Sequence, residues 1–185
     1  MFSLKKAVLV ASMIVLAACG ESKITEVDGT TSASADQSLK AMMKGMKDNE
    51  YLQMAGDIKM LHARYPGEEF GKALNGKDMD GFNAEVADTK KFFIQRGKER
   101  SNTEIQADID ELVQKNKEFT DFRIQSGDTS FDPANHPFTS KNLSRIENYK
   151  QKQATLASLS DDDYWKEYGC GCYQSSLGAT ANPLK

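Results

Sequence analysis

The first half of the chain carries short apolar stripes at helical spacing, separated by polar breaks. Ser34 and Gln37 form a capping-box pair, and the stripe of the helix they open is Leu39, Met42, Met43 and Met46. After Asp48-Asn49, a second predicted helix ends at Pro66-Gly67 and carries on one face Tyr51, Met54, Ala55, Ile58, Leu61, His62 and Tyr65. A short helical turn over 70–74 ends at Asn75-Gly76, which is typical of a left-handed cap.

Longer apolar stripes occupy the second half of the chain. The first predicts a helix over 78–97 with these inward residues: Met79, Phe82, Val86, Phe93 and Ile94. A second capping box, Ser101 and Glu104, predicts a new helix, with the stripe Ile105, Ile109, Leu112, Val113, Phe119 and Phe122. A loop is predicted over 124–138, since it contains Gly127, Pro133 and Pro137. A helix over 140–159 follows, with Leu143, Ile146, Tyr149, Leu156 and Leu159, and a short turn over 160–168 comes last.

These stripes predict an all-α fold, an irregular bundle in which the helices over 78–97, 101–122 and 140–159 form an antiparallel core. No segment alternates apolar and polar residues over a useful length, and no internal repeat is present. The composition suits helices, because proline is scarce and lysine, glutamate, glutamine, alanine, leucine and methionine are common.

The N-terminus has the pattern of an export signal. Lys5 and Lys6 precede an apolar run over 7–15, and Leu16-Ala17-Ala18-Cys19 follows. The apolar stretch of about 12 residues is shorter than the roughly 20 that a membrane-spanning helix needs. We therefore expect residues 1–18 to be a signal peptide.

Leu16-Ala17-Ala18-Cys19 resembles the lipobox of bacterial lipoproteins. The resemblance implies that the Cys19 thiol receives a diacylglycerol, that the signal is cut before Cys19, and that the new amine is acylated with a chain such as palmitate. Two or three acyl chains anchor a protein stably. Gly20 follows the cysteine, where an Asp would indicate retention in the inner membrane, so we expect the periplasmic face of the outer membrane.

The mature chain is mildly acidic and is expected to form one folded unit on a tether. Removing the two lysines of the signal leaves 22 basic against 27 acidic residues, a net charge of −5, which does not favour nucleic acid as a partner. Residues 19–33 are predicted to be the lipidated cysteine and a flexible tether, because 20–33 are rich in Thr, Ser and Gly. Residues 34–168 are the expected helical domain, and 169–185 an irregular tail.

Two segments resemble a wider group of proteins. Residues 16–54 (LAACGESKITEVDGTTSASADQSLKAMMKGMKDNEYLQM) and 73–86 (ALNGKDMDGFNAEV) are similar to an uncharacterised family of small helical Gram-negative lipoproteins. The resemblance covers about the first half of the chain and implies a location rather than an activity. Cys19 is the one residue whose role it supplies.

Two acidic segments invite a metal-binding interpretation. With Gly81 at position six of a calcium loop, Gly76 and Ala87 would occupy positions one and twelve, where oxygen donors are required. Asp78 and Asp80 are therefore better placed in the first turn of a helix, where negative charge is favourable. Asp161-Asp162-Asp163 follows Ser160, a predicted N-cap, and has the same interpretation. We expect no metal and no cofactor.

Histidines and aromatic residues supply little catalytic chemistry. His62 is predicted to be a packed residue at the apolar edge of its helix, and His136 lies in a loop near Phe131 and Phe138. No nucleophile motif or phosphate-binding glycine loop is present. An aromatic cluster near the C-terminus is expected to fold that segment back onto the helices, with interface formation as the alternative; it comprises Tyr164, Trp165, Tyr168 and Tyr173.

Cys170-Gly171-Cys172 holds the two thiols that remain when Cys19 is lipidated. In an oxidising compartment we expect a disulfide between Cys170 and Cys172. Its loop is only three residues, so the stabilisation is about 1.6 kcal/mol before strain, and the bond should be easily reduced. Pairing between chains, metal binding and redox chemistry are the alternatives.

The sequence thus predicts a non-enzymatic lipoprotein that acts by contact with another envelope protein. One alternative is a redox-active or metal-handling protein that uses Cys170 and Cys172. Another is an immunity or exclusion lipoprotein that binds a toxin or phage protein.

Overall fold

Residues 24–170, the part of the chain that the computed structural model describes, form six α-helices and no strand. The helices are α1 (Ser32–Met42), α2 (Asp48–Arg64), α3 (Glu68–Leu74), α4 (Met79–Gln125), α5 (Pro137–Ser158) and α6 (Asp161–Tyr168). The predicted all-α fold is confirmed. Across the described range, none of the helices combines the length and the apolar character needed to cross a membrane.

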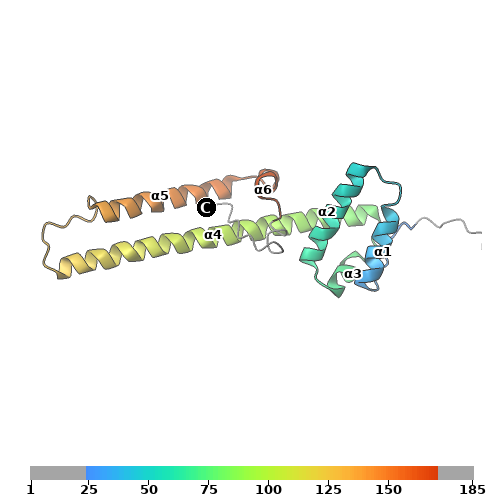
Figure 1. Ribbon diagram of the computed structural model, residues 1–185, viewed down its shortest axis with the longest axis horizontal. Helices are drawn as coiled ribbons and strands as arrows, with labels where there is room; N and C mark the ends of the chain where they lie inside the picture. Colours follow the sequence, from blue (N-terminus) through green and yellow to red (C-terminus); the bar gives the residue numbers. More distant parts are fainter. Residues whose placement is uncertain (1–23, 171–185) are drawn as a thin grey trace, which may run out of the picture.

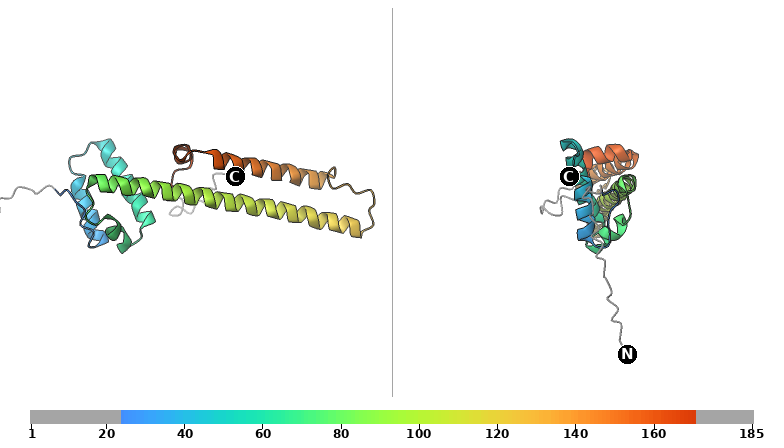
Figure 2. Two further views of the ribbon diagram at one scale, coloured as in Figure 1. Left: turned by 180° about the vertical axis from the view of Figure 1, so that it is seen from behind. Right: turned by 90° about the vertical axis from the view of Figure 1, so that its right-hand side faces the viewer.

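The molecule is elongated and has two ends of different construction (Figures 1 and 2). Helices α1, α2 and α3 gather around the start of α4 and form a unit that we call the head. Beyond the head, α5 lies antiparallel beside α4, so that the two make a long hairpin. Helix α6 lies at the end of α5 and contacts α4 between the head and the hairpin.

The predicted break between residues 97 and 101 does not exist, because α4 runs without interruption through 47 residues. The expected core of three long antiparallel helices is therefore wrong, since two of the three are one helix. No proline interrupts α4, and a single glycine such as Gly97 costs a helix only about 1 kcal/mol. Ser101 is buried inside the helix, and Glu104 accepts a hydrogen bond from Arg100 rather than capping.

Part of the predicted flexible tether is docked on the head. Val27 is 2% exposed, and its N–H donates to the carbonyl of Lys77 while the N–H of Gly76 donates to the Val27 carbonyl, each at 2.9 Å. Helix α1 begins at Ser32 with Thr31 as its N-cap, two residues before the predicted start at Ser34. The predicted tether is wrong from Val27 onward, because this apolar side chain is buried in the core of the head.

Two glycines let the docked segment approach α3 closely. A Cβ atom at Gly29 would lie 2.1 Å from the carbonyl oxygen of Gly71, and a Cβ atom at Gly71 would lie 2.8 Å from that of Gly29. Both distances are shorter than any normal contact, so neither position accepts a side chain without movement of the backbone. The short helix α3 is thereby held against residues 29–31.

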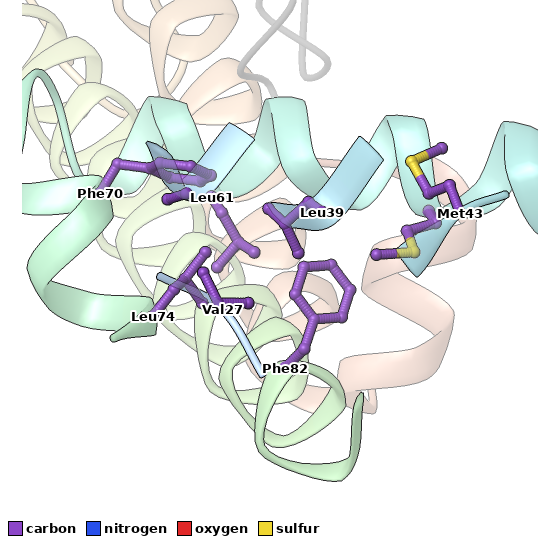
Figure 3. Packing of buried hydrophobic residues seen from close by; sticks show 9 residues of the cluster. Val27, Leu39, Met43, Leu61, Phe70, Leu74 and Phe82 are labelled. Atoms are coloured by element: carbon purple, nitrogen blue, oxygen red, sulfur yellow. The ribbon is translucent and has the colours of Figure 1, made fainter. Parts of the chain in front are cut away.

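The head has its own hydrophobic core, in which side chains from α1, α2, α3 and α4 converge on the docked segment (Figure 3). Its fully buried members include Val27, Leu39, Leu61, Phe70, Leu74 and Phe82. Full burial of a large apolar side chain contributes about 1.5–3 kcal/mol. The predicted turn over 70–74 is α3, and it supplies two of these residues.

A charged network joins α2 and α4 beside this core. The Tyr65 hydroxyl donates to Glu85 Oε1 at 2.6 Å, and Lys77 donates to the other carboxylate oxygen. Burial opposes ionisation of Glu85, but the hydrogen bonds from Lys77 and Tyr65 outweigh it and lower its pKa. Burial and the same carboxylate raise the pKa of Tyr65 to about 12.

Candidate interaction surface

The hairpin of α4 and α5 has a narrow core. Ile105, Ile109 and Leu112 of α4 pack against Ile146 of α5, with Tyr149 at the edge. Toward the tip the seam becomes polar, because Asn142 Nδ2 donates to Asn116 Oδ1 at 2.7 Å. These contacts fix which turns of the two helices face each other.

The loop at the tip, residues 126–136, is ordered by side chains that cap its own backbone. Asp128 accepts from the backbone N–H of Ser130 at 3.1 Å, and Asp132 accepts from that of Ala134 at 2.9 Å. His136 is the N-cap of α5, since its Nδ1 accepts from the N–H of Phe138, and Pro137 is the first helical residue. Helix α5 therefore begins three residues before the predicted start at residue 140.

Aromatic rings gather at this tip. The ring of Phe119 lies 4.7 Å from Phe138, 4.9 Å from His136 and 5.7 Å from Phe131, measured between ring centroids. Tilted and edge-on rings at these distances attract each other by about 0.5–1.5 kcal/mol beyond their burial. The cluster therefore fixes the loop and the first turn of α5 on the end of α4.

One face of the distal hairpin exposes large aromatic side chains. Phe122 is 63% exposed and Phe138 is 43% exposed. Each belongs to a stripe at helical spacing, and we call the two stripes together the aromatic face: Glu111, Lys115, Glu118 and Phe122 on α4, with Phe138, Lys141 and Arg145 on α5. The hydrogen bond from Lys115 lowers the pKa of Glu111, and the charge of Arg145 lowers it further. This effect of Arg145 is consistent with both stripes lying on the same side of the hairpin.

The opposite side of the hairpin carries a shallow groove, which we call the groove face. Its α4 wall includes Lys117 and Thr120, and its α5 wall includes Thr139 and Leu143. Val113, one turn before Lys117, is 52% exposed. Val113 on α4 and Leu143 on α5, which is 49% exposed, are thus two exposed apolar residues beside a groove with polar and apolar walls.

The acidic segments singled out in the sequence cap helices. Asp78 is the N-cap of α4 and accepts from the N–H of Gly81 at 2.9 Å. Ser160 caps α6, whose first turn holds the three aspartates. Two of them also hold α6 on α4, because Asp161 pairs with Lys98 and Asp162 with Lys90. In the range 24–170, no group of three or more His, Cys, Asp or Glu side chains is arranged to hold a metal ion.

The histidines and the C-terminal aromatic residues have structural contacts. His62 stacks on Phe70 with ring centroids 3.7 Å apart, as predicted for a packed residue, and its Nε2 lies 3.0 Å from Asp36. Tyr164 is buried against Ile94 and Leu156. Trp165 and Tyr168 lie beside this cluster, which docks α6 as expected. Tyr173 lies outside the described residues.

Among the cysteines, the structure describes Cys170 alone, and it is disulfide-bonded. Cys19 and Cys172 lie outside the described residues, so lipidation of Cys19 and the pairing of Cys170 with Cys172 stay predictions. Cys170 follows Gly169, whose φ of +61° ends α6. The disulfide therefore begins directly after the helix that Tyr164 docks.

Sequence reasoning identified neither the aromatic face nor the exposed apolar residues beside the groove. Val113, Phe122 and Leu143 were predicted to point inward, and the structure places all three on the surface. Ile105, Ile109 and Leu112 are buried on α4 and the half-buried Phe119 continues their stripe. Val113 and Phe122 lie about 80–100° away from the centre of that stripe. Strict 3.6-residue spacing would have shown this.

No protein family, curated protein or solved structure matches the chain.

Proposed function

We propose that this protein is a lipoprotein of the cell envelope, anchored by acyl chains on Cys19, which acts without catalysis by contacting proteins through the distal half of its hairpin. The exposed aromatic face on a rigid scaffold carries this proposal. The lipobox resemblance supports the anchor, and the outer membrane is its proposed location.

Burial of Val27 limits how far the head can move from the anchor. Val27 follows Cys19 by eight positions, and eight residues reach at most about 29 Å. Helix α4 has 47 residues and is about 70 Å long. The head is therefore held near the bilayer, whereas the tip of the hairpin lies at the opposite end of the molecule and is free to meet proteins at a distance from it (Figure 1).

The exposed phenylalanines are better suited to contact than to folding. Phe122 contributes little to the hairpin core, because 63% of it remains in water, and Phe138 packs on Phe119 while 43% of it stays exposed. Aromatic side chains held in fixed positions lose little conformational entropy on binding and are over-represented at binding hot spots. Phe138 is held by Phe119 at 4.7 Å, so the surface is formed before a partner arrives.

Site-resolved photo-crosslinking in cells tests this proposal. A photoreactive phenylalanine analogue placed at Phe122, Phe138, Val113 or Leu143 of the full-length chain should give protein adducts. The matched control is Leu52, which is 70% exposed but lies on α2 of the head. Adducts confined to the hairpin positions are the expected result. Equal labelling at Leu52, or no adduct at any hairpin position, would contradict the proposal.

A further inference from the structure

The two stripes of the aromatic face differ in charge. Helix α4 contributes Glu111 and Glu118, with Lys115 between them, whereas α5 contributes Lys141 and Arg145. All five side chains belong to exposed residues. The face therefore has an acidic edge and a basic edge that run along the hairpin.

The register of the hairpin places matching residues at the same level. Phe119 contacts Phe138, and Asn116 bonds to Asn142. Since the helices are antiparallel, Glu118 is level with Lys141, and one turn closer to the tip Phe122 is level with Phe138. At each level, the two helices thus carry side chains that can pair with each other, Glu118 with Lys141 and Phe122 with Phe138.

We propose that the aromatic face pairs with the same face of a second copy of this chain, around a two-fold axis parallel to the hairpin. Such an axis places α4 of one copy over α5 of the other at the same level. Glu118 then meets the Lys141 of the second copy, and Phe122 meets its Phe138, twice in each dimer. A two-fold axis across the hairpin would instead place α4 over α4 and bring acidic residues together, which is unfavourable.

The same axis leaves both N-termini at one end of the dimer. Two chains anchored through Cys19 in one membrane require this arrangement, so this part of the argument rests on the proposed function. It also excludes a head-to-tail pair, whose anchors would lie at opposite ends.

The size of the face predicts weak, reversible pairing. From residue 108 to 125 the hairpin is about 27 Å long, and two helices side by side are about 20 Å wide. The face therefore buries about 500 Å² on each copy, below the roughly 800 Å² of a standard interface. Confinement of anchored chains to one membrane raises their effective concentration and favours the pair.

Charge reversal with two tagged versions of the full-length chain tests the pairing. Both versions are co-expressed, and dimers are trapped in membranes by a photoreactive analogue at Phe122. Glu118→Lys alone, or Lys141→Glu alone, places like charges opposite each other twice, and each should reduce the dimer adduct by about fivefold to tenfold. When Glu118→Lys is co-expressed with Lys141→Glu, both contacts between the two chains become attractive, and the mixed dimer should return to the wild-type yield.

Co-expression of the two variants distinguishes contacts between chains from effects within one hairpin. Each variant keeps any repulsion inside its own hairpin, so only attractive contacts between the two chains can restore the dimer. Circular dichroism of each single variant shows whether it folds, and Lys117→Glu on the groove face is the matched control, which should leave the dimer adduct unchanged. Absence of a wild-type adduct at twice the mass of the chain would overturn the pairing, as would equal yields in all variants. An adduct of Phe122 with a different protein would overturn the pairing as well but would leave the proposed function standing.

Discussion

The hydroxyl of Tyr164 lies where a side chain at Gly97 would begin. A Cβ atom built on Gly97 would be 2.2 Å from that oxygen and 3.1 Å from the ring carbon that bears it. Tyr164 is 5% exposed and anchors α6, so the glycine in the middle of α4 is the position that admits α6 to the surface of the long helix. Ion pairs from Lys90 to Asp162 and from Lys98 to Asp161 add to this contact between the two helices.

Gly97→Ala should destabilise the protein although alanine favours helices. Alanine stabilises the helix by about 1 kcal/mol, but overpacking against Tyr164 costs about 1–3 kcal/mol. Detachment of α6 would further reduce stability, because its buried surface would become exposed. We expect a net decrease of about 1–2 kcal/mol in the free energy of unfolding, measured by urea denaturation of residues 20–185. Adding Tyr164→Phe to Gly97→Ala should recover part of the loss, since the nearest atom is then absent.

Gly56→Ala is the matched control for Gly97→Ala. Gly56 lies inside α2, and a Cβ atom there meets no neighbour within 4 Å. The substitution should therefore increase stability by about 0.5–1 kcal/mol. If Gly97→Ala also stabilises the protein, Tyr164 does not dock where the structure places it.

Leu112 and Val113 are adjacent in sequence and face opposite environments. Leu112 is 4% exposed in the seam of the hairpin, whereas Val113 is 52% exposed. Leu112→Asp places an unpaired charge in this seam and should cost about 3–5 kcal/mol. Val113→Asp should change the free energy of unfolding by less than about 0.5 kcal/mol. Similar losses in both variants would mean that a different face of α4 packs against α5.

The network around Glu85 predicts a stability change in alkaline solution. The pKa of Tyr65 is about 12 in the folded protein, against an ordinary value of 10.0. A raised pKa means that the folded state holds the proton more tightly, so the stabilisation is fully present below pH 10.0 and is lost as the pH rises through about 12. Wild type should therefore lose more stability than Tyr65→Phe between these values. Parallel curves for the two proteins would show that the Tyr65–Glu85 bond does not carry this effect.

Much of the fold could be predicted from local patterns, because amphipathic spacing and capping residues act over a few positions. Ser160 as the cap of α6, Pro66-Gly67 as the end of α2 and the turn over 70–74 followed directly from such signals. The continuity of α4 did not, because Ser101 and Glu104 have the composition of a capping box while tertiary packing buries Ser101 within a helix.

The long-range features of the candidate site were beyond local reasoning. The docking of Val27 on the head involves backbone hydrogen bonds with Lys77 and Gly76, which are about fifty positions away in the sequence. The aromatic face likewise requires two helices and their register, because Phe122 lies on α4 and Phe138 on α5. The residue types were visible in the sequence, but their shared surface was not.

Labelling of cells with radioactive or clickable palmitate tests the central claim, that Cys19 anchors this protein to a membrane, most directly. The wild-type chain should incorporate the label and sediment with membranes, and Cys19→Ser should do neither. The matched control Cys172→Ser retains Cys19 and should be labelled like wild type. An unlabelled wild-type protein that is recovered in the soluble periplasmic fraction would contradict the account.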